Sequence, residues 1–219
     1  SRKSRGLGDV YKRQMYAGAV SSGNGITNIG DKAVTITDTT VSDASTLVTL
    51  NSSTSGVITA SSVTAVTGTA SVLNTLLTAG NVTSEFSTDS FESLATATVS
   101  DSTLSVADLN GAISAANTAT SGTSTVFSLS AGATINTGDQ SAFTTLLGYE
   151  NAGQVEISDQ NIKVEGDLDT ATANLLNDTT TGTVTATIAS SEVSILKLLR
   201  GTNAYTITIA LEDAAVSAS

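Results

Sequence analysis

The stretch LDTATANLLNDTTTGTVTATIAS, residues 168–190, contains the two patterns that decide the fold class. In TVTATIAS (183–190), Val, Ala or Ile alternates with Thr or Ser. A period of two with β-branched residues is typical of a strand with one buried face. In LDTATANLL (168–176), Asp and Thr precede apolar residues spaced three and four apart, which predicts a short amphipathic helix with a polar N-cap. The stretch therefore predicts a helix followed by a half-buried strand.

Both patterns recur along the chain. The strand pattern returns in AVTITD (33–38) and YTITIALE (205–212). The helix pattern returns in DASTLVTL (43–50), TASVLNTLL (69–77), VADLNGAISAA (106–116), DQSAFTTLL (139–147) and SEVSILKLL (191–199). Acids stand where the first helical turn would be, which favours the helix dipole: Asp43, Asp108, Asp139, Asp169 and Glu192.

A spaced Leu, Gly and Val or Ile motif indicates an internal repeat. The Gly follows the Leu by six residues and the Val or Ile by eight, in Leu50/Gly56/Ile58, Leu147/Gly153/Val155 and Leu176/Gly182/Val184. We expect these Gly residues at the C′ positions that end helices. Units recur at irregular intervals of about 23 to 37 residues, which is the range of solenoid repeats.

The fold class predicted from these patterns is α/β. Strands joined through helices, without tight hairpins, favour parallel pairing with right-handed crossovers. One face of each predicted strand is polar, so we expect helices to cover the other face only. The prediction is a repeat solenoid of alternating strands and short helices, with one parallel sheet and helices on one face.

The N-terminal tip does not belong with the rest of the chain. Residues 1–14 hold five of the nine basic residues. They lack the apolar run of a secretory signal, and their Gly and Asp do not favour the amphipathic helix of a transit peptide. One codon choice for SRGLGDVYKRQ (4–14) resembles a transposon-end sequencing adapter read in frame. We therefore interpret residues 1–14 as a sequencing artefact and expect them to be disordered, so a secretion signal is not observable.

The remaining chain divides into two parts. We expect an irregular lead-in over residues 15–30 and a β/α repeat array over residues 31–219, looser after about residue 85.

Beyond residue 14 the chain has nineteen acids against four basic residues, a balance of −15. Phosphate contacts need Lys and Arg, so nucleic acid is not expected as a partner. No apolar run approaches the length of a membrane helix, so membrane insertion is not expected either.

The composition narrows the possible chemistry. The chain has no Cys, His, Trp or Pro, and Ser and Thr make up about a third of it. Thiolate and imidazole metal sites and Ser-His-Asp or Cys-His nucleophilic systems are therefore excluded. A glycosidase could be built from Asp and Glu alone, but no aromatic sugar platform accompanies the acids. We predict that the chain is not an enzyme.

Residues 25–77 carry a resemblance. The segment opens with GIT…IG…AVTITDTTV, continues through NSSTSGVITASSV and closes with GTASVLNTLL. It resembles repeat units of very large Thr/Ser-rich surface or secreted proteins of marine bacteria, cyanobacteria among them. The likeness fades from about residue 85 onward. It implies an extracellular structural or adhesive array and supplies no catalytic residue.

Calcium is the one metal that the acids could hold, because it prefers oxygen ligands. The candidates are Asp167 and Asp169 in EGDLD, with further acids around residues 38–43 and 85–92. None has the spacing of a known calcium loop. The alternative is helix N-capping and solubility, so we predict no cofactor and keep calcium as a weaker possibility.

Thr-x-Thr pairs define a possible binding face. Parallel strands about 4.8 Å apart would stack such pairs into a flat hydroxyl array like those of ice-binding β-solenoids. The candidate positions for this face are Thr35, Thr37, Thr183, Thr185, Thr187, Thr206 and Thr208. The alternative is that Thr simply suits exposed strand positions.

The sequence therefore predicts a non-catalytic structural or adhesive repeat segment of a large extracellular or cell-surface bacterial protein. Its expected partners are neighbouring repeats of the same parent chain. The alternative is a binding module that uses the threonine-lined sheet face for ice or a cell-surface glycan.

Overall fold

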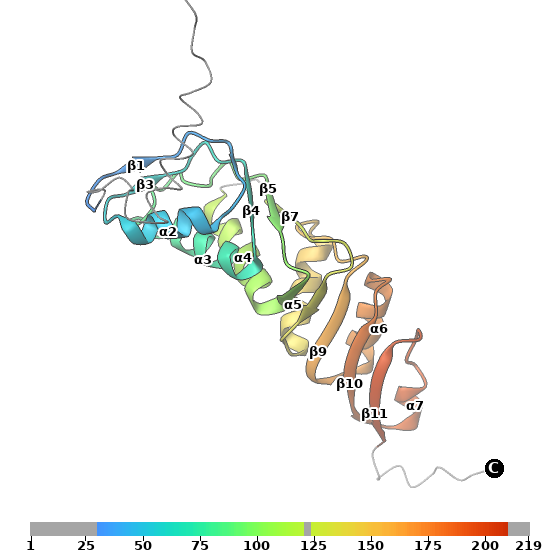
Figure 1. The fold of residues 1–219 in the computed structure, drawn as a ribbon. Coiled ribbons are helices and arrows are strands. Elements are labelled where there is room, and N and C mark those ends of the chain that lie inside the picture. The colour runs from blue at the N-terminus through green and yellow to red at the C-terminus, as the bar shows by residue number, and fades with distance from the viewer. Residues whose placement is uncertain (1–29, 121–123, 210–219) are drawn as a thin grey trace, which may run out of the picture.

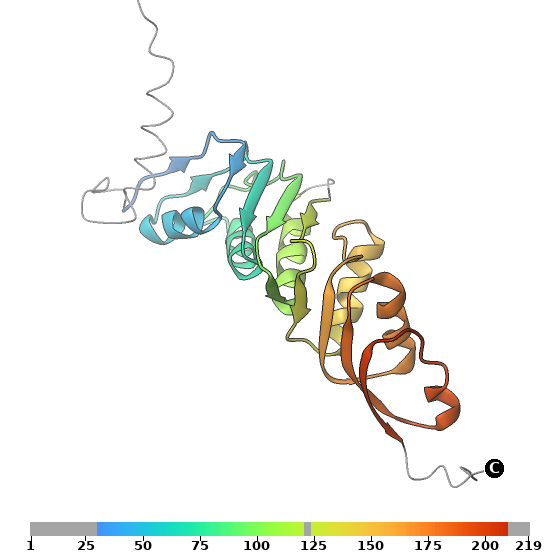
Figure 2. The ribbon, with the colours of Figure 1, turned by 45° about the vertical axis from the view of Figure 1, so that its right-hand side comes forward.

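The computed structural model describes residues 30–120 and 124–209. The predicted artefact, nearly all of the predicted lead-in and residues 210–219 lie outside the described residues. Strands and helices alternate along the chain, and every strand pair is parallel. The α/β class with parallel sheets is therefore confirmed. The molecule is elongated, and a layer of helices adjoins the strands along its length (Figures 1 and 2). In Figure 1 the helices lie below and to the left of the strands at the blue end and to the right of them at the red end.

All six stretches with the helix pattern form helices. They are α2 (Ser45–Ser53), α3 (Ala70–Gly80), α4 (Val106–Ala119), α5 (Gln140–Asn151), α6 (Thr170–Thr179) and α7 (Val193–Leu196). The predicted N-caps Asp139 and Asp169 each accept the backbone N–H of the third residue after the cap. Thr69 and Ser105 do the same for α3 and α4. Side-chain capping therefore sets where most of these helices begin.

The strands are mostly short. They are β1 (Val34–Thr35), β2 (Thr40–Val41), β3 (Ile58–Thr59), β4 (Ala65–Gly68), β5 (Thr96–Val99), β6 (Thr103–Ser105), β7 (Val126–Ser128), β8 (Thr134–Asn136), β9 (Asn161–Leu168), β10 (Val184–Ser191) and β11 (Ala204–Ile209). The first sheet pairs β1 with β3, the second has the order β2-β4-β5-β7, and the third has the order β6-β8-β9-β10-β11. Neighbouring strands in each sheet follow one another in chain order.

The prediction of one sheet is wrong, because the described strands form three sheets. Each early unit turns in the middle of its strand-forming stretch and so contributes short strands to two adjacent sheets. AVTITD (33–38), predicted as one strand, pairs only at Val34–Thr35, and the chain re-enters a sheet at β2. Between β7 and β8 the turn includes Gly132, whose φ of 66° favours glycine. Only β9 and β10 run for eight residues.

Inward-facing apolar residues stack in rows across the sheets. In the second sheet, Val41, Val66, Ala97 and Phe127 occupy successive register positions, and all are buried. The third sheet continues the same arrangement with Leu104, Ile135, Ile162 and Val184. The helices lay buried Leu, Ile and Phe side chains over these rows. Fully burying such a side chain contributes about 1.5–3 kcal/mol, so these rows form the core.

Two of the three repeat glycines are needed for close contact between units. Gly153 follows the α5 C-cap with a φ of 71°, as predicted for C′. Gly56 and Gly182 instead lie two residues beyond their C-caps without a positive φ. A Cβ on Gly182 would overlap the Gln160 carbonyl, and one on Gly56 would overlap the Lys32 carbonyl. The C′ prediction is therefore wrong for these two, because the constraint comes from the neighbouring unit.

A Thr two residues before each of these glycines completes the motif. The Thr180 hydroxyl donates to the Gln160 carbonyl at 2.6 Å and accepts the Gly182 N–H at 2.9 Å. The Thr54 hydroxyl donates to Lys32 O at 2.8 Å and accepts the Gly56 N–H at 2.9 Å. The same Thr-x-Gly turn therefore joins neighbouring units at both ends of the described chain.

Replacing Gly182 with Ala should destabilise the protein by about 1–3 kcal/mol, because the new methyl group must push the Gln160 backbone away. Gly148→Ala is the matched control, since nothing lies within 4 Å of its Cβ position in α5. That control should stabilise by up to about 1 kcal/mol. Guanidinium unfolding of both variants measures the difference. Equal stability of the two would contradict the close approach at Gly182.

Candidate functional site

Five of the seven threonines predicted as a binding face lie near one another on the third sheet. Thr185 and Thr187 are on β10, Thr206 and Thr208 are on β11, and Thr183 immediately precedes β10. Thr187 is opposite Thr206 in the register. Thr187 is half-buried and the other four are exposed. The C-terminal strands thus present a small hydroxyl patch two strands wide.

Charged residues border this patch on β9. Lys163 is opposite Thr185, and Asp167 is opposite Thr187. The neighbouring strand therefore interrupts the hydroxyl array with one cation and one anion. A flat surface made only of threonine does not extend across the sheet.

The other two predicted positions lie elsewhere. Thr35 is on β1, in the first sheet, where it is opposite Thr59. Thr37 follows β1 outside any strand. The structure therefore does not bring the seven threonines together on one surface. Sequence periodicity identified the outward positions correctly but could not say that the strands belong to separate sheets.

A further hydroxyl row lies on the second sheet. The register aligns Thr67 of β4, Thr98 of β5 and Ser128 of β7. The alternation in TATV (96–99) indicates the outward direction of Thr98 from sequence alone. Its alignment with Thr67 and Ser128 depends on loop lengths, so sequence reasoning missed the row. These hydroxyls can donate and accept hydrogen bonds.

The calcium candidates are used differently by the fold. The Asp169 carboxylate accepts the Thr172 N–H at 2.7 Å and the Gln140 side-chain amide at 2.6 Å. The Gln140 amide oxygen in turn accepts the Asp169 N–H at 2.8 Å. Asp167 is exposed on β9. Over residues 30–120 and 124–209, no group of three or more acids is placed to hold a metal ion. Asp169 therefore acts as an N-cap, which was the alternative interpretation.

Capping changes the acidity of Asp169. The hydrogen bond from the Thr172 backbone N–H lowers the pKa of the Asp169 carboxyl below its ordinary value of 3.8, and the Thr172 and Gln140 side chains act in the same direction. Partial burial opposes them. Because the carboxylate form is favoured in the folded state, its contribution is present at neutral pH and is lost as the pH falls through the folded pKa.

Asp169→Ala should lower stability at pH 7 by about 1 kcal/mol, since α6 loses its N-cap. The difference between wild type and variant should shrink as the pH falls below 4, because protonation removes the same interaction from the wild type. Thermal melts at several pH values measure it. A difference independent of pH would mean that the carboxylate does not cap the helix.

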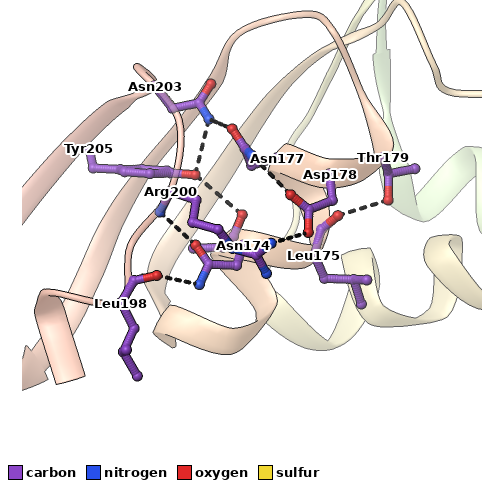
Figure 3. Close-up of polar contacts among 10 residues, drawn as sticks. Asn174, Leu175, Asn177, Asp178, Thr179, Leu198, Arg200, Asn203 and Tyr205 are labelled. Carbon is purple, nitrogen blue, oxygen red and sulfur yellow. Dashed lines mark hydrogen bonds and ion pairs between the residues drawn. The ribbon is translucent and has the colours of Figure 1, made fainter.

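A polar network joins the last described unit to α6 (Figure 3). The Asn174 side chain donates to the Leu198 carbonyl and accepts the Arg200 N–H, both at 2.8 Å. Asn174 is 8% exposed. The Asn174 amide therefore forms the hydrogen bonds of the Leu198 carbonyl and the Arg200 N–H, just beyond α7. These two backbone groups are not used to extend the helix. This explains why α7 ends at Leu196 although the apolar pattern runs to residue 199.

A second set of contacts strengthens the same junction. Asn203 donates to Asn177 of α6 at 2.6 Å and to the Tyr205 hydroxyl at 3.3 Å. The Tyr205 hydroxyl donates to the Ala173 carbonyl at 3.3 Å. Burial raises the pKa of Tyr205 above its ordinary value, so the hydroxyl keeps its proton. Arg200 also pairs with Asp178 at 3.0 Å on the exposed surface (Figure 3).

Asn174→Ala should cost about 1–3 kcal/mol, because Leu198 O and the Arg200 N–H lose their partner. Asp178→Ala removes the exposed ion pair with Arg200 and an exposed hydrogen bond from the Asn177 amide, and should cost less than about 1 kcal/mol. Chemical unfolding of both variants compares the two effects. A larger loss for Asp178→Ala would show that the ion pair, and not the buried amide, holds the junction.

A shallow depression lies on the helical side, lined by Asn74, Thr75, Thr78, Ala79, Val82 and Glu85. Glu85 is the one ionisable residue of this lining, and it accepts a hydrogen bond from the Asn51 side chain. The amides, hydroxyls and carboxylate of this lining can form hydrogen bonds with polar groups.

None of the helices in the described part of the chain is long and apolar enough to span a membrane. Comparisons with protein-family models, curated proteins and solved structures find no match. The geometry of the surfaces above is therefore the basis for a functional proposal.

Proposed function

We propose that this chain is a non-catalytic structural or adhesive segment of a large extracellular or cell-surface bacterial protein. Its described part would be a repeat solenoid in which each strand–helix unit stacks on the previous one. The proposed partners are neighbouring repeats of the same parent chain. The resemblance of residues 25–77 to Thr/Ser-rich surface proteins supports the location.

The observation that carries this proposal is a recurring amide bridge between helices. In α3 and α4, Asn occupies the fifth and the twelfth position after the N-cap, on one helical face two turns apart. At the fifth position, Asn74 donates to the Asp108 side chain at 3.5 Å and Asn110 donates to the Ala142 carbonyl at 2.8 Å. Asp108 and Ala142 each lie three residues after the N-cap of the next helix. Equivalent residues therefore contact equivalent places in the next unit, as repeats do.

Helix packing supports the same interpretation. The side chain of Asn74 lies so close to Gly111 that a Cβ on that glycine would overlap it. Helices contact their neighbours in chain order, α2 with α3, α3 with α4, α4 with α5 and α5 with α6. Contact limited to successive units is the defining property of a solenoid.

Hydroxyl groups repeat the pattern along the strands. Thr125 donates to Leu94 O at 2.8 Å, and Ser130 donates to Val99 O at 3.3 Å. Thr64 and Thr181 make the same kind of bond to Thr39 O and Ser158 O. Ser and Thr are therefore used to connect units, which supports a structural role for the composition.

Duplicating one strand–helix unit tests whether the proposed repeats stack as separate modules. The register places Ile162 opposite Val184, so a second copy of residues 162–183 inserted between Thr183 and Val184 should add one unit. We expect a single cooperative melt at an unchanged or higher temperature, with helix and strand signals in circular dichroism increased in proportion. An insert of Gly and Ser with equal length is the control and should lower the melting temperature.

Loss of the folded state in the duplicated chain, with the control insert tolerated, would contradict the solenoid proposal. A structural role further requires that the purified protein has no hydrolytic activity on polysaccharides. Activity that depends on a pair of carboxylates would replace the structural proposal with an enzymatic one.

A further inference from the structure

The third sheet has a second row of inward-facing apolar residues, and this row is not covered at the last strand, β11. The register aligns Leu168 of β9, Ile188 of β10 and Ile207 of β11. Their exposed fractions are 0%, 1% and 48%. The first two are covered because another strand–helix unit follows them. Ile207 occupies the same position in the row and has no such cover among the described residues.

Other exposed apolar side chains belong to the same C-terminal part of the described chain. Ile209 on β11, Ile195 on α7, Leu198 beyond α7 and Leu175 on α6 are 43–59% exposed. Among the described residues before α6, Val126 is the single large apolar side chain exposed to this degree, at 43%. We call β11 with Ile195 and Leu198 the C-terminal edge. Apolar exposure at one end of the molecule marks a surface made for contact.

The charge balance of the C-terminal part of the described chain also differs from that of the rest. Residues 170–209 hold Asp178 and Glu192 against Lys197 and Arg200, a balance of zero. Residues 30–169 hold fifteen acids against two lysines, a balance of −13. The part of the chain that carries the C-terminal edge is therefore neutral overall and lacks the repulsion that acidic surfaces exert on one another. It suits a partner that is acidic, as the earlier units are.

We propose that the C-terminal edge binds a further strand–helix unit of the same parent chain, whose strand pairs in parallel with β11. This inference rests on the proposed function and names the place where the array continues. The argument is continuity with an interface already present, because β10 on β9 and β11 on β10 are both parallel. A further unit would cover Ile207 as β11 and α7 cover Ile188.

The register specifies the experiment. Because Ile207 has the position of Leu168, residues 208–219 are replaced by a second copy of residues 169–191, joined directly to Ile207. The copied helix and strand should then stack on α7 and β11. Hydrogen exchange measured by mass spectrometry should show β11 amides exchanging about tenfold slower or more than in the unextended chain. The melting temperature should rise.

The control carries the same extension with Val184→Asp and Ile188→Asp in the appended copy only. It should leave β11 exchange as fast as in the unextended chain, because charged residues cannot cover the apolar row. Protection in this control equal to that in the intact extension would overturn the proposal, since it would not depend on the apolar contact.

Three further outcomes distinguish failure of the edge inference from failure of the proposed function. If the extension fails to protect β11 while the internal duplication of residues 162–183 still folds, the edge inference is overturned and the structural function stands. If sedimentation shows that the unextended chain is a stable dimer with β11 amides already protected, the occupant is a second copy. That result would also overturn the proposal. Failure of the internal duplication as well would overturn the structural function itself.

Discussion

The constraint on which the structure depends is the distance between parallel strands, about 4.8 Å. Each strand must bring its backbone this close to the neighbouring strand of its sheet. Bulky residues at the closest points would prevent it, so the chain places Gly182 against the Gln160 carbonyl and Gly56 against the Lys32 carbonyl. At the same points a Thr hydroxyl satisfies the carbonyl. The presence of Gly and Thr at these points, and their spacing in the sequence, therefore both follow from the distance between parallel strands.

The same constraint explains the unusual richness in small polar residues. Short strands cannot satisfy all their backbone groups through ladders alone, and each unpaired buried group costs about 1–3 kcal/mol. Side chains from the neighbouring unit supply partners: Thr125 reaches Leu94 O, and Asn174 holds both Leu198 O and the Arg200 N–H. Ser, Thr and Asn are short enough to do this without separating the units. The apolar residues are then free to form the inward rows.

Much of the fold follows from local patterns. The caps at Asp139 and Asp169 and the alternation in TVTATIAS predict α5, α6 and β10, because those elements depend on neighbours in the sequence. The division into three sheets does not follow, since it depends on turns without a strong sequence signal. The role of Gly182 also escaped prediction, as its constraint is a carbonyl in another unit. The threonine positions were read correctly as outward, but their grouping required the register.

The orientation of the ladders has a mechanical consequence. Hydrogen bonds between parallel strands run from unit to unit, along the long direction of the molecule (Figure 1). Tension applied between the two ends would load these bonds lengthwise, so they open one strand at a time and do not resist together in shear. A released unit of about thirty residues extends to about 100 Å. A chain with its sheets arranged in this way would yield stepwise under load and lengthen greatly before it is fully extended.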